Sequence, residues 1–267
     1  MEKQELLKEY KNQDDKILLS FILDKIKFVT TKNKIENTNF LNMQQIDLVE
    51  VFLKKIKYTN YILWGGYETA ERKVLILYPD KLNENMISKN YSKIMNIVRI
   101  KLPENEYGKY SHRNYLGAII KLGIEREKVG DILVSDEGAD IIVLNDISKY
   151  LMQELPMLKR FESSNIIEEK IEKLNKVEPK VELIKIIVPS ARLDNFVSDL
   201  AKTSRTKAIE IIKNERVFVN GKLELKTSKQ IKENDIITIR GKGRFVVKEF
   251  SGTTRSGRTI AIIERFI

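Results

Sequence analysis

The sequence contains no cysteine and a single histidine among its 267 residues. The absence of cysteine excludes a disulfide scaffold, a thiol nucleophile, an iron–sulfur cluster and a zinc site with cysteine ligands. The single histidine, His112, cannot build a zinc site from several histidine ligands, and no Ser-His-Asp set is evident around it. We therefore expect no metal and no cofactor.

Long apolar runs are also absent. The N-terminal stretch MEKQELLKEYKNQDDK carries scattered charges and no apolar region follows it, unlike a secretory signal. The longest apolar stretch nearby, residues 17–23, is interrupted by Ser20 and is too short to span a bilayer. Hydrophobic residues still make up 42% of the chain, which is enough for packed cores. We expect a soluble, cytoplasmic protein with several domains.

Negative charge is scarce in the last third of the chain. Residues 185–267 hold 18 Lys and Arg against 9 Asp and Glu, which accounts for +9 of the total net charge of +10. The first 184 residues are therefore nearly neutral. A concentrated basic module indicates a polyanionic partner, either nucleic acid or an anionic membrane surface. A solvated basic face without a partner is the alternative.

The spacing of apolar residues divides the chain before this basic module into two parts. Residues 1–58 are predicted to be helical, from the spacing in DKILLSFILDKIKFV and NMQQIDLVEVFLKKI, with Asn39 or Asn42 as a cap. Residues 59–180 alternate short strands (YILW, KVLILYP, MNIVRIKL, DILVSDEGADIIVLN) with helices, which predicts a small α/β or α+β domain. The charged segment EEKIEKLNKVEPKVE is expected to be a helix or a connector.

Residues 181–267 are predicted to form the last domain. VELIKIIV reads as a strand, ARLDNFVSDLA and SRTKAIEIIKN as two helices, and RVFVNGKLE as a hairpin. DIITIRGKGRFVVKEFSG and RTIAIIERF read as strands joined by glycine-rich turns. The predicted fold class is α+β: N-terminal helices, a small middle domain, and a C-terminal domain of two helices and a small sheet.

The stretch SRTKAIEIIKNERVFVNG places positive charge at a helix start. Ser204 is the predicted N-cap, so Arg205 and Lys207 lie where the peptide dipoles favour anions and disfavour added positive charge. A bound phosphate would compensate this cost, and Arg192 repeats the arrangement at the preceding helix. Asn220-Gly221 supplies the positive φ angles of a tight hairpin turn, which also brings the backbone close to a partner.

These anchors resemble the S-four RNA-binding domain. The resemblance is carried by Arg192-Leu193-Asp194, Ser204-Arg205-x-Lys207-Ala208, Val217-x-Val219-Asn220-Gly221 and Asp235-x-Ile237. It implies two helices and a small sheet that present a basic face to structured RNA. One departure is Glu215, where the family usually has a glycine as a left-handed C-cap, and we expect Asn214 to take the left-handed conformation instead.

The remainder of the chain resembles the YlmH family along nearly its whole length. The likeness is carried by GGYETAERKVLILYP, HRNYLGAIIKLGIEREKVGDILV and RGKGRFVVKEFSGTTRSGR. It implies an RNA-recognition-like domain at residues 59–180, between an N-terminal helical region at 1–58 and the S-four domain at 181–267. It also implies a non-enzymatic factor for stalled translation that binds large ribosomal subunits holding peptidyl-tRNA. Relatives have also been described as division-associated.

The predicted partner is structured RNA on the large ribosomal subunit: ribosomal RNA, with tRNA left open. No catalytic or metal-binding residue is predicted, and the oligomeric state is unknown. His112 and Arg113 are left open between helix packing and an RNA contact. The predicted RNA-binding residues are Arg192, Ser204, Arg205, Thr206, Lys207, Asn220, Gly221, Lys222, Lys242, Arg244, Arg255 and Arg258.

Two other functions compete with this reading. Pseudouridine synthases have a catalytic aspartate in an Arg-Leu-Asp, but here Arg192-Leu193-Asp194 falls inside the S-four helix and NFVSDL follows it. A methyltransferase needs a glycine-rich cofactor loop, which WGGY followed by ETAER does not supply. A basic membrane-surface or cell-division factor is the second alternative, although no large amphipathic stripe carries the basic residues.

Overall fold

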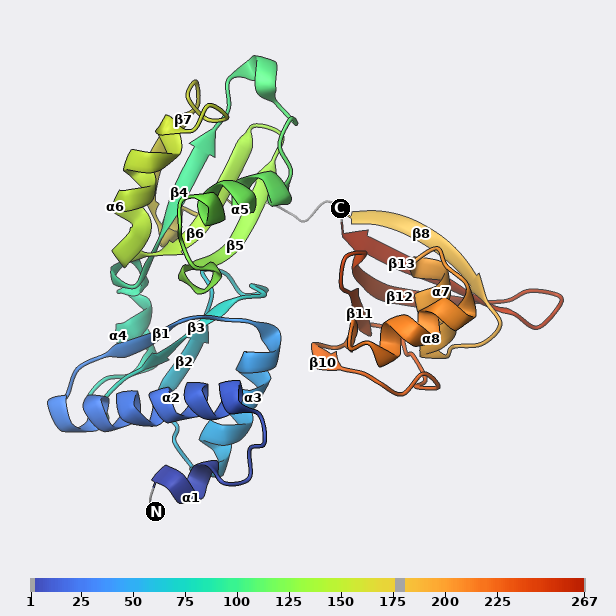
Figure 1. Ribbon diagram of the computed structural model, residues 1–267, viewed down its shortest axis with the longest axis horizontal. Coiled ribbons are helices and arrows are strands. Elements are labelled where there is room, and N and C mark those ends of the chain that lie inside the picture. The colour runs from blue at the N-terminus through green and yellow to red at the C-terminus, as the bar shows by residue number, and fades with distance from the viewer. Residues whose placement is uncertain (1–2, 176–180, 267) are drawn as a thin grey trace. The chain divides into compact units, whose positions relative to one another are not determined.

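The computed structural model describes residues 3–175 and 181–266. The chain divides into two compact units, Met1–Val177 and Glu178–Ile267 (Figure 1). Helices and antiparallel sheets occur in both units, so the predicted α+β class is confirmed. The domain boundary predicted after residue 180 adjoins residues 176–180, which lie outside the described ranges, and it stays a prediction.

The first part of unit one packs three helices with a three-stranded sheet. Its strands run in the order β1-β3-β2 and all pairs are antiparallel. Apolar side chains of the helices, such as Phe52, pack with Leu75 and Leu77 of the sheet. The elements are α1 (Lys3–Leu7), α2 (Gln13–Lys32), β1 (Glu36–Leu41), α3 (Met43–Lys55), β2 (Tyr61–Trp64) and β3 (Lys73–Leu77).

Residues 1–58, predicted to be helical, contain the helices α1, α2 and α3 but also the strand β1, which was not predicted. The strand ENTNFL is mostly polar, so no local apolar pattern predicts it. Its conformation is set by pairing with β3. The same sheet joins β1 to β2 and β3, and therefore crosses the boundary predicted at residue 58. Of the two predicted caps, Asn42 caps α3 and forms a capping box with Gln45.

The second part of unit one is a four-stranded sheet in the order β5-β6-β4-β7. The helices α5 and α6 contribute Tyr115, Ile119 and Leu151 to a core with the sheet. Ile142 and Leu144 instead pack with Phe40 and other residues of the first sheet. The elements are α4 (Glu84–Ser88), β4 (Met95–Lys101), α5 (His112–Lys121), β5 (Val129–Ser135), β6 (Gly138–Leu144), α6 (Asn145–Glu154) and β7 (Asn165–Lys170).

The segment EEKIEKLNKVEPKVE was predicted to be a helix or a connector. Its start is neither, because residues 168–170 complete the strand β7. Residues 171–173 form a short 3-10 turn, and residues 176–180 lie outside the described ranges. Glu168 and Glu169 pair with Val98 and Ile97 of β4, so sheet pairing again prevails over local charge.

Hydrogen bonds to the side chain of Asp131 connect the two sheets of unit one. The carboxylate of Asp131 accepts hydrogen bonds from the Tyr67 hydroxyl (2.7 Å), the Glu71 amide (2.8 Å) and the Arg72 amide (3.2 Å). Arg72 in turn donates Nη2 to the Phe40 carbonyl at 2.9 Å. Burial, reinforced by the charge of Arg72, lowers the pKa of nearby Arg126 to about 10. The hydrogen bonds to Asp131 link the loops GGYETAERK and GIEREKVGD, which therefore have a structural role.

Unit two is a six-stranded antiparallel sheet with two helices on one face (Figure 1). Its strands run in the order β10-β9-β11-β12-β13-β8, and β12 and β13 form the longest hairpin. The elements are β8 (Val181–Val188), α7 (Leu193–Leu200), α8 (Arg205–Lys213), β9 (Val217–Val219), β10 (Lys222–Leu223), β11 (Ile236–Ile239), β12 (Gly243–Thr253) and β13 (Thr259–Phe266).

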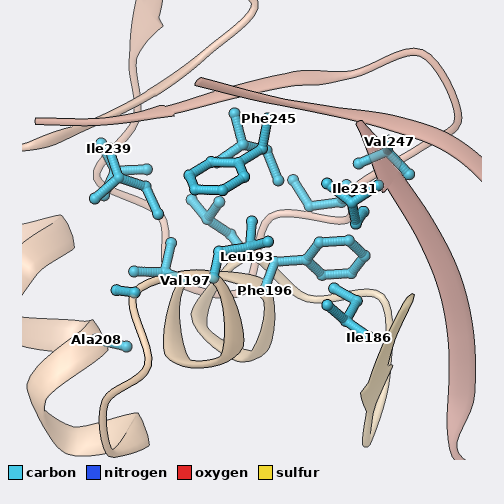
Figure 2. Close-up of a cluster of buried hydrophobic side chains, with 14 of the residues drawn as sticks. Ile186, Leu193, Phe196, Val197, Ala208, Ile231, Ile239, Phe245 and Val247 are labelled. Carbon is cyan, nitrogen blue, oxygen red and sulfur yellow. The ribbon is translucent and has the colours of Figure 1, made fainter. Parts of the chain in front are cut away.

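The core of unit two lies between the helices and the inner face of the sheet (Figure 2). Leu193, Phe196 and Val197 point from α7 toward Phe245 and Val247 of β12 (Figure 2). Burial of these side chains fixes α7 on the sheet, and thereby fixes the loop from which α8 starts.

No helix in the described part of the chain combines the length and the apolar character needed to cross a bilayer.

We predict that Gly138→Ala destabilises unit one by roughly 3 kcal/mol, because backbone strain and a steric clash act together. The residue has φ +147°, and an added Cβ would lie 1.9 Å from the Ile100 carbonyl oxygen across the β4–β6 pair.

The control is Gly117→Ala in α5, where an added Cβ meets nothing within 4 Å. This change should stabilise unit one by about 0.5–1 kcal/mol. Urea unfolding followed by Trp64 fluorescence measures both, because Trp64 is the only tryptophan and lies in unit one. Equal stability of the two variants would contradict the prediction.

Candidate nucleic-acid interface

The N-terminus of α8 is capped by Ser204, as predicted. The Ser204 hydroxyl accepts a hydrogen bond from the Lys207 amide at 3.3 Å, and its carbonyl accepts one from the Ala208 amide at 2.9 Å. The amides of Arg205 and Thr206 precede these bonds and belong to the group of helix-start donors that lack an intrahelical acceptor. Together with the peptide dipoles they favour an anion at this point.

A buried carboxylate holds two arginines beside this helix start. The Asp194 side chain is only 1% exposed, although it opens α7 in sequence. Arg192 binds it with two parallel hydrogen bonds, Nε to Oδ1 at 3.1 Å and Nη2 to Oδ2 at 2.9 Å. Arg205 adds Nε and Nη2 to Oδ2 at 3.1 and 2.8 Å. The Nη1 atom of each guanidinium takes no part in this pairing.

We call Arg192, Asp194 and Arg205 the arginine clamp. Within it, Asp194 compensates the charge of Arg205 at the helix start, which was not predicted from the sequence. Burial by itself raises the pKa of Asp194, but the hydrogen bonds and charges of Arg192 and Arg205 together outweigh it and hold the pKa below its ordinary value. Asp194 is therefore ionised at neutral pH, and the clamp keeps one net positive charge.

The loop between β10 and β11 fixes the clamp from the other side. The Leu193 amide donates to the Lys229 carbonyl (2.9 Å) and the Asp194 amide donates to the Thr227 carbonyl (3.0 Å). Arg192 also forms an isolated antiparallel bridge with Gln230. The backbone around Asp194 is thus held in place before any partner binds.

An open groove of ≈730 Å³ lies beside the start of α8. It is lined by the cap residue and by three cations, two from residues 202–205 and one from the β12–β13 hairpin, and Asp199 is the acid among its lining residues. Arg258 reaches the groove from the β12–β13 hairpin and donates Nη2 to the Ile187 carbonyl at 3.4 Å. Burial raises the pKa of Asp199, and the charge of Arg258 opposes this. The three cations are Lys202, Arg205 and Arg258.

Four of the predicted RNA-binding residues therefore gather at this end of unit two. Ser204, Arg205 and Arg258 line the groove, and Arg192 joins them through the clamp. Thr206 and Lys207 follow on the exposed first turn of α8. Arg255 is exposed in the same β12–β13 hairpin as Arg258.

The Asn220–Gly221 turn has the predicted conformation, with φ 53° and 77°. The Asn220 side chain is engaged within the fold, since Nδ2 donates to Asp235 (2.8 Å) and Oδ1 accepts from the Ile236 amide (2.8 Å). Asn220 and Gly221 therefore shape the hairpin, while Lys222 is exposed at the start of β10. None of the three lines the groove.

Lys242 and Arg244 lie at the opposite end of the strands. The β11–β12 turn adjoins Arg216, because the Arg240 amide donates to the Arg216 carbonyl at 2.8 Å, whereas the groove adjoins the last residues of β8. The Arg244 guanidinium lies 5.0 Å from the centre of the Phe266 ring. The structure thus separates these two residues from the groove.

The end of α8 departs from the expectation for Glu215. Glu215 itself is left-handed with φ 57°, whereas Asn214 has φ −83°, so the role assigned to Asn214 was wrong. The Glu215 amide donates to the Ile212 carbonyl (3.1 Å) and the Arg216 amide to the Ile211 carbonyl (3.3 Å). These bonds satisfy helix-end carbonyls and offset the steric cost of a side chain in this conformation, which is about 1–2 kcal/mol.

Sequence reasoning missed two features of the site. Lys202 is exposed, has φ 51° and lines the groove. Its position directly before the Thr203-Ser204 cap is a local signal that it would lie beside the helix start. The burial of Asp194 has no local signal, because Asp at the start of a helix is usually exposed and favours the dipole.

The described residues contain no group of three or more His, Asp or Glu side chains placed to hold a metal ion. His112 begins α5, and desolvation of its ring, reinforced by the nearby charge of Arg126, lowers its pKa.

Comparisons with known proteins match each part of the chain. The model "YlmH, N-terminal" matches residues 16–82, "Putative RNA-binding domain in YlmH" matches residues 89–186, and "S4 domain" matches residues 191–237. The Ribosome-associated protein quality control protein P2 of Bacillus subtilis (strain 168) is 26% identical over 255 residues, which cover 95% of this chain and 96% of that protein. A solved structure of the cell division protein ylmH from Streptococcus pneumoniae is 24% identical, covers 62% of this chain and 98% of that chain, and gives a TM-score of 0.48.

We predict that Asp194→Asn destabilises unit two by about 1–3 kcal/mol at pH 7, because charge-assisted hydrogen bonds to two arginines are lost. The folded pKa of Asp194 lies below its unfolded value of about 3.9. The stabilisation from Asp194 is therefore complete above that value and is lost as the pH falls through the folded pKa. Hydrogen exchange of the amides of α7 and α8 at pH 7 and in acid measures the difference.

The matched control is Glu210→Gln, which removes an exposed carboxylate from α8 outside the clamp. It should leave amide protection unchanged at both pH values. A difference between wild type and Asp194→Asn that stays constant down to about pH 2 would contradict the role given to the ionised carboxylate.

Proposed function

Because the chain belongs to the YlmH family, we propose that this RNA-binding protein is a non-enzymatic factor that acts on the ribosome. In this proposal it binds ribosomal RNA or tRNA in the cytoplasm, on large subunits that carry stalled peptidyl-tRNA. The name of the Bacillus subtilis relative, which is similar over 95% of the chain, supports a role in translation quality control.

The observation that carries the proposal is the convergence of three cations on a capped helix start. Lys202 and Arg205 lie on either side of the Ser204 cap, Arg258 comes from the β12–β13 hairpin, and all three line one open groove. Such an arrangement suits the phosphate oxygens of a nucleic-acid backbone, since it offers both mobile positive charges and fixed amide donors. The second unit also contains nearly all of the net positive charge of the chain.

The mode of binding follows from these groups. A phosphate at the start of α8 accepts from the amides of Arg205 and Thr206, while Lys202 and Arg258 neutralise phosphates on either side. Arg192 and Arg205 offer their Nη1 atoms, because the clamp uses only Nε and Nη2. Contacts of this kind position a structured RNA and read little of its sequence.

The nearly neutral first unit has a different task in this proposal. It contacts a second surface of the ribosomal complex, RNA or protein, and selects the state that carries peptidyl-tRNA. The match of residues 89–186, most of which lie in this unit, to a domain described as RNA-binding supports this division.

We predict that Lys202→Ala/Arg258→Ala weakens binding to purified large subunits and lowers the salt slope of the affinity by about two units, one for each lost phosphate contact. Co-sedimentation over a series of salt concentrations measures both quantities. The control pair, Lys185→Ala/Lys213→Ala, removes the same charge from exposed positions outside the groove and should change the slope far less. Equal effects of both pairs would show that only overall charge matters, against the proposed groove.

We further predict that the protein prefers large subunits that retain peptidyl-tRNA over vacant ones. Competition between labelled stalled subunits and unlabelled vacant subunits measures this preference. Equal affinity for both would refute the proposed selection of stalled complexes, while RNA binding through the groove would stand.

A further inference from the structure

The strand β2 forms an open edge of the first sheet. Among the residues that the structure describes, it pairs with β3 alone, with Tyr61 opposite Leu77 and Leu63 opposite Leu75. The Tyr78 amide donates to the Asn60 carbonyl at 3.1 Å, which places residues 60, 62 and 64 in the hydrogen-bonded positions of this antiparallel pair. The backbone groups of Tyr61 and Leu63 therefore point away from β3.

Only part of this edge is already used. The Tyr61 amide closes a tight turn onto the Thr59 carbonyl at 3.0 Å. By the register of the pair, the Tyr61 carbonyl and both the amide and the carbonyl of Leu63 remain directed to the open side. An incoming strand needs such a row of alternating acceptors and donors.

A groove of ≈1030 Å³ runs between this edge and the helix α3. Val51 of α3 is 65% exposed and lines the groove together with Ile46, while Tyr61 and Leu63 line it from β2. An edge strand beside a helix is the arrangement in which proteins bind extended peptides, because the strand offers main-chain bonds and the helix offers contacts for alternate side chains.

The charges of the groove favour an acidic occupant. Three lysines line it against two glutamates, Glu50 and Glu84. Lys54 lies in the last turn of α3, Lys57 follows in a left-handed conformation with φ 55°, and Lys73 begins β3. Pairing of β2 with a second copy of this chain would bring two such sets of lysines together, which disfavours a dimer through this edge.

We propose that the β2 edge and the α3 groove bind an extended, acidic segment of a partner protein. The segment adds to the sheet as a fourth strand, bonded to the Tyr61 carbonyl and to both backbone groups of Leu63. Its apolar side chains contact Val51 and Ile46, and its carboxylates face Lys54 and Lys57. This site lies in unit one and does not depend on the RNA-binding groove of unit two.

The test uses the full chain and a fluorescein-labelled octapeptide of alternating valine and glutamate, with binding measured by fluorescence anisotropy. We expect saturable binding that is lost when lysine replaces glutamate in the peptide. Binding is also expected to be lost when alternate peptide amides are N-methylated, because strand addition requires these donors. Hydrogen exchange should show new protection of the Leu63 amide in the complex.

Lys54→Glu/Lys57→Glu should weaken binding at least about tenfold, through repulsion of the acidic peptide. The control Lys27→Glu/Lys32→Glu makes the same charge change at exposed positions of α2 and should leave the affinity unchanged. Leu63→Pro removes the outward amide at an edge position where proline is tolerated, and should abolish binding while Trp64 fluorescence still reports a folded unit one.

Each of the following results would overturn the proposal. These are the absence of binding at millimolar peptide, equal binding of the lysine peptide, and an affinity that the Lys54→Glu/Lys57→Glu change does not alter. Protection of the Leu63 amide by an RNA hairpin, with no competition from the acidic peptide, would assign the groove to nucleic acid instead and would equally refute it.

Discussion

The RNA-binding surface proposed for unit two depends on one buried carboxylate. Asp194 is almost inaccessible, so its charge must be matched within the fold, and Arg192 and Arg205 do this from two different segments. Because Arg205 is the first residue of α8, the ion pair fixes the start of this helix against the start of α7. The position of the groove beside α8 follows from that link.

The clamp also reconciles two demands on the same helix start. Positive side chains there oppose the peptide dipoles, yet an anion-binding surface needs them. Asp194 removes this cost in the folded protein and leaves part of each guanidinium directed outward. Lys202 and Arg258 then add charge from the loop before α8 and from the β12–β13 hairpin, so that no single segment concentrates all the repulsion.

Features decided by neighbouring residues could be predicted from the sequence, and those decided by tertiary contacts could not. The Ser204 cap and the Asn220–Gly221 turn follow from local chemistry and were predicted correctly. The bond between Asp194 and Arg205 joins residues eleven positions apart and exists only after α7 and α8 pack. The strand β1 was missed for a similar reason, since its polar residues acquire their conformation by pairing with β3. Which basic residues lie together also could not be predicted, because it depends on the strand register. That register separates Lys242 and Arg244 from the groove.

Crosslinking between the bound protein and large-subunit RNA, with the protein sites read by mass spectrometry, tests the central claim most directly. The account predicts crosslinks in unit two at residues 202–207 and 255–258, next to the helix start and in the β12–β13 hairpin. Crosslinks confined to residues 240–244, at the opposite end of the strands, would contradict the assignment of the RNA-binding surface to the groove that the Asp194 clamp positions.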